Sequence, residues 1–533
     1  MKKLLLLLFA FVPFINYAAE QGIDEKIDVW FGDVTGWFVS IIFYQIEFTP
    51  DVKVYWVLFP LIIGATFFTF YFRLINFTGF KTAIQIVRGK YDDIESEGDD
   101  HVEASDAVHK VDGDNPDTIR IEKDEDHHGE VTHFQALTAA LSATVGLGNI
   151  AGVAIALSIG GAGATFWMII AGFLGMASKF VECTLGVKYR EIGPDGTVYG
   201  GPMYYLRKGL AAKGWKIGGR VLAVVFAIMC IGGSFGGGNM FQVNQAFQLV
   251  ENITGGEASF FHGKGWLFGI IMAILVGIVI IGGIKKIAKV TDKIVPFMVA
   301  IYVIAALFIL IMKYDMIGDA FGQIFAGAFT PIGVAGGVVG VLVQGFKRAA
   351  FSNEAGIGSA SIAHSAVKTK YAASEGLVAL LEPFIDTVLV CTMTALVLII
   401  TGFVDTSNSG MNDAQAILLT SSAFESTISW FPYVLTVAVV LFAFSSMISW
   451  SYYGYQAWSY LFGRTKKVEY SYKLLFCMFV IVGSAASLNS VLAFSDAMIF
   501  AMMVPNMIGL FILAPRAKEE LVRFMKKIKE SKK

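Results

Sequence analysis

Charged residues are scarce in this chain. Asp, Glu, Lys and Arg make up 16% of its 533 residues, whereas soluble domains carry about 25%. Cysteine is rare as well, and the four that are present show neither metal-ligand spacing nor a pairing signal. The composition therefore argues against a soluble domain, a disulfide scaffold and a cysteine metal site. With a net charge of −2 we expect no nucleic-acid partner.

Hydrophobic residues are abundant instead, at 55% of the chain. Apolar runs close to the roughly 20 residues that a helix needs to cross lipid recur throughout, so we predict an all-α membrane protein embedded in the lipid bilayer. We expect about eleven transmembrane helices, on that length criterion. They lie approximately at 54–71, 133–158, 163–187, 219–250, 265–283, 292–312, 332–353, 373–400, 430–461, 470–487 and 491–514.

The N-terminal region falls into four segments. Residues 1–19 carry two lysines, a leucine-rich core and small residues at the end, which is the pattern of a cleaved signal peptide, and the alternative is an uncleaved short anchor. Residues 20–53 form an external segment, and 54–90 hold a peripheral transmembrane helix followed by an interfacial helix. Residues 91–130 are an acidic cytoplasmic insert, whose histidines lack a fixed ligand spacing and are interpreted as solvated rather than metal-binding.

Basic residues fall in alternate loops and in the tail at 516–533. Under the positive-inside rule this pattern places the C-terminus in the cytoplasm. It predicts a multi-pass protein of the plasma membrane, which in a bacterium is the inner membrane. Lys313 lies at an outer helix end against this pattern, but one lysine can reach the interface.

The second predicted span carries a dense glycine cluster around one polar residue. Gly146, Gly148 and Gly152 surround Asn149, and each glycine weakens a helix by roughly 1 kcal/mol relative to alanine. Because an opened backbone in lipid is tolerated only where it lines a cavity or is buried in protein, we predict a helix break from Val145 to Asn149. Its free N–H groups suit a carboxylate, and its free C=O groups suit sodium. The alternative is a glycine-rich helix that packs closely on a neighbour.

The ten spans after the peripheral one divide into two sets of five, at 131–313 and 314–515. An odd number of spans in each half gives the halves opposite orientations, which is the inverted-repeat plan of many secondary transporters. The first helix of the second half is also interrupted, because glycines lead into it and the run from Ser352 to Gly356 follows it. Corresponding breaks in two halves point to a central binding site.

Polar side chains in other spans complete this candidate site. Gln242 and Asn353 are neutral and suited to bond a substrate amino group, although Gln242 would serve equally as a helix-to-helix hydrogen bond. Ser445 and Ser446 offer adjacent hydroxyls to sodium, a hard cation that prefers oxygen, and the alternative is that they pack between helices.

Charged residues near the second break are costly at depth. Lys347, Arg348 and Glu354 each carry an insertion penalty of about 2.5–3.5 kcal/mol. We therefore expect Lys347 or Arg348 to form a structural bridge with Glu182 or Glu354, and the alternative is direct contact with the substrate.

Six short runs carry a resemblance to a known family. They are Gly148 to Ala154, Ala164 to Met168, Lys188 to Glu191, Tyr199 to Tyr205, Phe351 to Gly356 and Trp450 to Gly454. Together they resemble the sodium:alanine symporter family, also called alanine or glycine:cation symporters, in family order from about residue 130 to 515. The Ser-Asn-Glu-Ala-Gly run is the most specific of them.

The resemblance implies a leucine-transporter-like fold and sodium-driven uptake of small neutral amino acids, mainly alanine and glycine. It implies a carboxylate site at Gly146, Leu147, Gly148 and Asn149, an amino-group site at Gln242 and Asn353, and side-chain crowding by Met447 and Trp450. The transported sodium would be bound by Ser445 and Ser446 with backbone oxygens near Val145.

Two departures from the family and three rival functions accompany this reading. The acidic insert at 91–130 is longer than is usual in the family. Leu147 stands where family members usually have Thr, which removes a hydroxyl from the expected site. The rivals are proton or exchange coupling through Glu354, an ion channel whose filter the glycines line, and a membrane enzyme. No nucleophile–base pair or clustered histidine ligands occur in the spans, which argues against the enzyme. No obligate protein partner is evident.

Overall fold

The computed structural model describes residues 23–50, 52–96, 129–193, 196–330, 336–403, 416–486 and 488–531. The predicted signal peptide and most of the acidic insert lie outside these residues. Helices dominate the described part, and its strands form two small antiparallel hairpins. One hairpin consists of β1 (Gln45–Thr49) and β2 (Val52–Tyr55), and the other consists of β3 (Glu191–Ile192) and β4 (Val198–Tyr199).

Seven helical segments of the described chain are long and apolar enough to cross a membrane, and one bent pair brings the number to eight. The seven are α9 (Gly163–Lys188), α11 to α12 (Lys216–Ile253), α14 (Gly283–Met312), α18 to α20 (Ala372–Ile400), α22 (Phe431–Phe462), α23 (Lys466–Ala485) and α24 (Leu488–Glu530). The bent pair is α7 (His133–Thr144) with η2 (Gly148–Gly152) and α8 (Val153–Gly160).

The other three predicted spans are helices that fall short of the usual spanning length of about 20 residues. They are α3 (Leu58–Tyr71), α13 (Gly265–Ile280) and α16 (Gly337–Asn353), with 14, 16 and 17 residues. The α16 helix also carries two basic side chains. The helical membrane class is thus supported. Among the described residues this criterion identifies up to eight spans, and the number of eleven stays a prediction.

Further helices precede or connect these segments. On the N-terminal side they are α2 (Ile23–Ile42), α4 (Ile75–Thr78), α5 (Phe80–Val87), α6 (Asp92–Ser96), α10 (Pro202–Ala211) and η4 (Gly256–Ala258). On the C-terminal side they are η5 (Tyr314–Met316), α15 (Ile317–Phe329), α17 (Ala360–His364) and α21 (Ala416–Glu425). The spanning segment Ala372–Ile400 itself consists of α18 (Ala372–Ala379), α19 (Leu381–Pro383), η6 (Phe384–Cys391) and α20 (Thr392–Ile400). The α11 helix (Lys216–Phe235) joins α12 (Phe241–Ile253) through the π-helical η3 (Gly236–Met240).

Two boundaries differ from the sequence prediction. The tail predicted at 516–533 is not a separate segment, because α24 continues through Pro505 and Pro515 to Glu530. The start of the predicted acidic insert is also ordered: α6 forms there, and Tyr91 and Glu95 are buried. The ring of Tyr91 packs edge-on against Phe524 of α24, which explains why this part of the insert is held against the helices.

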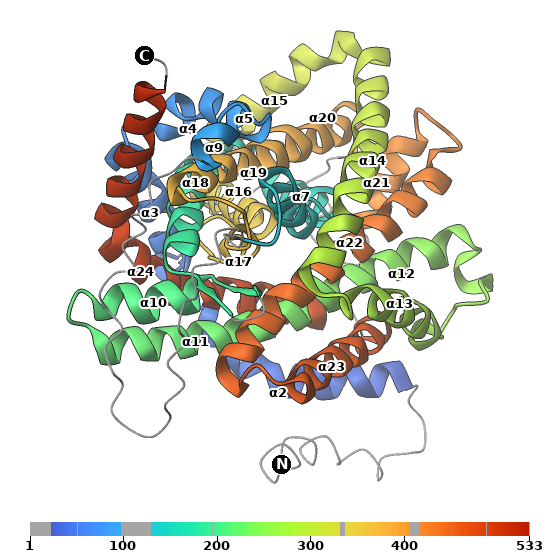
Figure 1. Ribbon diagram of the computed structural model, residues 1–533. Helices are drawn as coiled ribbons and strands as arrows, with labels where there is room; N and C mark the ends of the chain where they lie inside the picture. The colour runs from blue at the N-terminus through green and yellow to red at the C-terminus, as the bar shows by residue number, and fades with distance from the viewer. Residues whose placement is uncertain are drawn as a thin grey trace.

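The interrupted helices lie in the middle of the assembly. Figure 1 shows α7, α16 and α17 surrounded by the longer helices, with α24 at one edge and α2 beside α23 at another. The α9 helix packs against α16, α17 and α18, so it connects the elements around both interruptions. A side chain at the centre is therefore approached from several segments that are far apart in sequence.

Candidate substrate and ion site

The first interruption lies between α7 and α8. The α7 helix begins at a capping box formed by Thr132 and Gln135 and ends at Thr144, after which Val145 is extended. The π-helical turn η2 then leads into α8, and the two parts are bent by 52°. The predicted break between Val145 and Asn149 is confirmed. The N–H groups of Asn149 and Ile150 donate back to the carbonyls of Gly146 and Leu147, at 3.2 and 3.3 Å. The N–H groups of Leu147 and Gly148, at the start of the second part, are therefore the ones left for an anion.

Asn149 braces this break from within. Its Oδ1 accepts a hydrogen bond from the N–H of Gly146 at 2.8 Å. Its Nδ2 donates to the carbonyl of Asp386 at 3.0 Å and to the Asp386 carboxylate at 2.6 Å. Because both ends of the amide are engaged by protein, Asn149 shapes the turn, and the backbone beside it is the part left for a ligand.

Gly146 and Gly148 allow other helices to approach the break. A Cβ on Gly146 would lie 2.7 Å from Oγ of Ser446 and 3.5 Å from Oε1 of Gln242. A Cβ on Gly148 would lie 3.4 Å from Ser352. Three helices, α22, α12 and α16, therefore bring polar side chains directly onto the glycine backbone. Leu147 between the two glycines is fully buried.

Gln242 offers a buried acceptor with no protein partner. Its Nε2 donates to the carbonyl of Gly237 at 3.0 Å, whereas its Oε1 has no hydrogen bond. An unpaired buried polar atom is unfavourable by roughly 1–3 kcal/mol. Since this oxygen faces Gly146, a ligand bound at the break with a donor group would satisfy it.

Trp450 forms an apolar wall beside this acceptor. A Cβ on Gly238 would lie 2.2 Å from the Trp450 ring, so the indole packs directly against the glycine backbone of η3. Met447, one turn earlier on α22, is also fully buried. The structure therefore brings Gln242 and Trp450 to the same glycine-rich turn, and places Met447 on the helix that carries Trp450.

The two predicted sodium ligands differ in their surroundings. Oγ of Ser446 donates to the carbonyl of Ser142 at 3.0 Å, and it also faces Gly146. Ser142 in turn donates to the carbonyl of Ser445 at 2.8 Å. The Ser445 hydroxyl instead donates within its own helix, to Phe442 at 3.0 Å. Hydroxyl and carbonyl oxygens thus gather at the end of α7, which is the donor chemistry that sodium prefers.

The second interruption follows α16. Glu354 adopts a left-handed conformation with φ of 56°, and Gly356 and Gly358 also have positive φ, at 86° and 99°. Asn353 accepts from the N–H of Ala355 at 3.0 Å and donates to Thr387 at 2.9 Å. Its amide is thus engaged away from Gln242, and it is the neighbouring Ser352 that faces the first break.

Asp386 joins the two interruptions and was missed from sequence. This fully buried carboxylate accepts from Asn149 of the first break, from Ser352 of α16 at 2.8 Å, and from Thr387 at 2.7 Å. An ionisable residue inside a span is a functional signal in its own right. That signal was present in the sequence. The contacts of Asp386 were not, because a partner such as Asn149 lies more than 200 residues away in the chain.

The basic pair on α16 has a different partner from the one predicted. Lys347 and Arg348 both pair with Asp496 of α24, at 3.0 and 3.2 Å, and not with Glu182 or Glu354. Glu182 accepts from Asn506 at 2.9 Å, and Glu354 accepts from Ser359. The prediction was wrong because the left-handed turn at Glu354 directs that carboxylate back onto its own loop.

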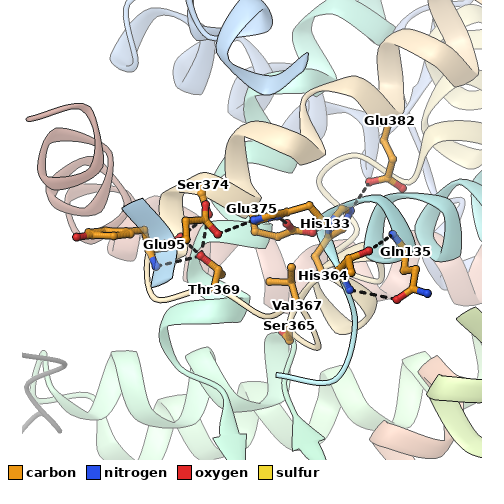
Figure 2. Close-up of polar contacts among 12 residues, drawn as sticks. Glu95, His133, Gln135, His364, Ser365, Val367, Thr369, Ser374, Glu375 and Glu382 are labelled. Atoms are coloured by element: carbon orange, nitrogen blue, oxygen red, sulfur yellow. Dashed lines mark hydrogen bonds and ion pairs between the residues drawn. The ribbon is translucent and has the colours of Figure 1, made fainter. Parts of the chain in front are cut away.

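A second polar cluster lies at the far end of α7 (Figure 2). His133, the first residue of α7, contacts Glu95 of α6 through Nε2 at 2.7 Å and Glu375 of α18 through Nδ1. His364 of α17 lies between Glu375 and Glu382, with its Nε2 3.4 Å from Glu382. Glu382 also pairs with Lys179 of α9 at 3.3 Å. We refer to these six residues as the His–Glu chain; sequence analysis did not identify it.

The fold and the central site together define a class. A buried membrane helix is interrupted at glycines, an unpaired acceptor and hydroxyls face the interruption, and a second helix breaks beside it. Discontinuous transmembrane helices that form a binding site near the middle of the membrane are typical of secondary transporters.

Comparison with known proteins agrees with this class and gives the family. The chain belongs to the sodium:alanine symporter family, whose sequence model matches residues 116–533. A sodium/alanine symporter of Methanococcus maripaludis is 41% identical over 393 residues, which cover 74% of this chain and 84% of the relative. An uncharacterized transporter of Haemophilus influenzae is 37% identical over 418 residues, covering 77% and 87%. An amino-acid carrier protein of Bacillus subtilis is 36% identical over 325 residues, covering 60% and 64%. These relatives are transporters and not enzymes.

Proposed function

We propose that this protein is a secondary active transporter that couples sodium to the uptake of small neutral amino acids, with alanine and glycine as substrates. The observation that carries the proposal is the unpaired Oε1 of Gln242, which faces the Gly146 backbone beside Oγ of Ser446. An amino acid presents both the anion and the donor that this arrangement lacks. Membership of the sodium:alanine symporter family supports the choice of ion and substrate.

Each end of the substrate has a matching group. The carboxylate would be held by the N–H groups of Leu147 and Gly148, at the positive end of the second half-helix. The ammonium would donate to Oε1 of Gln242. Trp450 and Met447 would limit the side chain, and the absence of a hydroxyl at Leu147 leaves the carboxylate to the backbone alone.

Sodium would bind next to the substrate. Ser446, together with carbonyl oxygens at the end of α7, supplies neutral oxygens near Val145. Ser445 would have to rotate from Phe442 to join them. Because Ser446 faces both the α7 carbonyls and Gly146, sodium bound there would fix the turn that binds the substrate.

The arrangement of the spans belongs to the same proposal. Eleven spans, with one peripheral helix and two inverted sets of five in a leucine-transporter-like fold, would place the two interruptions in equivalent positions of the two halves. The shorter α3, α13 and α16 helices would complete that number. The basic ends of α9 and α24 would then face the cytoplasm, in a plasma membrane that in a bacterium is the inner one.

The test is uptake of labelled alanine into proteoliposomes under an imposed sodium gradient. Accumulation with sodium, and none with an equal potassium gradient or a pH gradient, is the expected result. Uptake driven by the pH gradient alone would refute sodium coupling and direct attention to Asp386 and Glu354. No alanine uptake under any gradient would refute alanine as the substrate.

A further inference from the structure

The His–Glu chain is an alternating series of acidic and basic groups that the substrate site does not use. In spatial order it runs Glu95, His133, Glu375, His364, Glu382 and Lys179, and all six residues are buried. Figure 2 shows Glu95, His133, Glu375, His364 and Glu382 drawn together, and they belong to α6, α7, α18, α17 and α19. Burial of this many ionisable groups is unfavourable unless they are paired.

The contacts of His133 fix the number of protons in its part of the chain. One ring nitrogen faces a Glu95 oxygen at 2.7 Å and the other faces a Glu375 oxygen. A neutral imidazole donates through only one nitrogen. With two ionised carboxylates, a neutral ring would leave one of the two contacts without a proton. The group must therefore hold one extra proton, either on the ring or on one of the carboxyl groups.

The position of His133 relates this proton to α7. The α7 helix has 12 residues, so at 1.5 Å per residue it extends about 18 Å between His133 and the break. The α7 helix therefore connects the His–Glu chain at its first residue to the break at its last. The residues before it are tied to the segment after α17, because Lys368 donates to the carbonyl of Val131 at 2.8 Å and Glu130 donates to Ala366 at 2.7 Å.

We propose that His133, Glu95 and Glu375 form a proton-binding latch that keeps α7 closed over the substrate site and releases one proton when α7 moves away. The inference rests on the proposed transport function, because a transporter has to open its site at the α7 end. A solvated histidine has an ordinary pKa near 6.5. Once separated from its carboxylates, His133 would therefore lose the extra proton to neutral solution.

Other charged groups border the latch without replacing it. Arg190 donates to the carbonyl of Ser365 at 2.8 Å, and Asp292 of α14 accepts from Gln135 at 3.4 Å. Lys179 and Glu382 adjoin His364 at the other side of Glu375. Because Glu375 is shared by both histidines, His364 holds it in place whether or not α7 is closed.

The latch predicts how the motion of α7 depends on pH. Opening that releases one proton becomes more favourable by up to about tenfold for each pH unit. The dependence should hold above about pH 6.5 and flatten below, where the separated histidine is protonated as well. In acid the closed form is favoured.

Hydrogen–deuterium exchange of the full-length protein in nanodiscs tests this without any substrate. Corrected for the intrinsic pH dependence of exchange, protection of the α7 peptide should fall by up to about tenfold per pH unit above 6.5, while protection of α9 stays constant. His133→Gln should lower α7 protection and abolish its pH dependence. Glu95→Gln leaves His133 with one carboxylate contact, which a neutral ring satisfies, so it should also remove most of the dependence.

His262→Gln is the matched control. His262 is exposed and contacts Glu251 at 2.9 Å, outside the His–Glu chain, so its loss should leave the α7 response as in the wild type. A pH-independent α7 in the wild type would overturn the latch, and so would a wild-type pH response in His133→Gln. Failure of sodium-driven alanine uptake would overturn the proposed function alone. The latch would still be tested by hydrogen–deuterium exchange, which needs no substrate.

Discussion

Gln242→Leu separates substrate binding from stability. The substitution removes an acceptor that has no partner in the protein, so the unfavourable burial of Oε1, roughly 1–3 kcal/mol, disappears. It also removes the bond from Nε2 to Gly237, which contributes about 1 kcal/mol. The two changes offset each other, and we expect the thermal unfolding midpoint to stay near that of the wild type.

Alanine binding should suffer much more. A hydrogen bond to a charged group contributes about 1.5–3 kcal/mol, which at 1.4 kcal/mol per factor of ten corresponds to about a 10- to 150-fold weaker affinity. Isothermal titration of alanine at saturating sodium measures this directly. The affinity for sodium alone should change little, because its proposed ligands are on α7 and α22.

Gln245→Leu provides the matched control. Gln245 lies one turn further along α12, is fully buried, and has no hydrogen bond at either Oε1 or Nε2. It is not among the nearest neighbours of Gly146, which are Ser446 and Gln242. Its replacement should preserve alanine affinity. If Gln242→Leu binds alanine within about twofold of the wild type while folding normally, the assignment of the ammonium site is refuted.

Further predictions follow from the same geometry. Ser446→Ala should raise the sodium concentration needed for half-maximal alanine uptake several-fold, and Ser445→Ala should do so less, because only Ser446 faces the α7 carbonyls; equal effects would contradict this. Asp386→Asn should abolish uptake while the protein still inserts, because the bonds from Asn149 and Ser352 lose their charged acceptor; wild-type uptake would contradict its bridging role. Gly238→Ala should displace Trp450 and reduce alanine uptake, whereas Gly277→Ala, whose Cβ would meet only Cys477 at 3.6 Å, should not. Burial would raise the pKa of Glu191, but Lys208, Arg464 and Arg207 lower it below its usual range. Its contribution to stability is therefore present above pH of about 4.3 and lost as the pH falls through the lowered pKa, so Glu191→Gln should lower the unfolding midpoint at pH 7 more than at pH 4.

The first interruption was predictable because its cause is local. Three glycines around Asn149 weaken a helix wherever it sits, and the lipid requires that the freed backbone be covered. The residues that face it on α12 and α22 were also found, since amide and hydroxyl groups are rare inside apolar spans. The local pattern did not predict how the side chains are oriented. Asn149 and Asn353 were predicted to bind the substrate, and in the structure their amides bond Asp386 and Thr387.

Partners distant in sequence could not be predicted in the same way. Asp496 lies 148 residues beyond Arg348, and several carboxylates were equally plausible partners until the helices were placed. Glu95 was assigned to a solvated insert on composition alone, but the aromatic contact of Tyr91 with α24 holds that stretch against the helices. Long-range packing decides such pairings, and hydrophobic periodicity carries no information on it.

Asp386 gives the central site a mechanical property that neither interruption has alone. Its Oδ1 accepts from Asn149, whose Oδ1 in turn accepts from the N–H of Gly146, while its Oδ2 accepts from Ser352 of α16. The turn that would bind the substrate carboxylate and the helix before the second interruption are therefore joined through one rigid carboxylate. A ligand that draws the Gly146 turn toward Gln242 must stretch or release the bonds at Asp386. Since hydrogen bonds to a buried charge are among the strongest in a protein, the two interruptions should change conformation together.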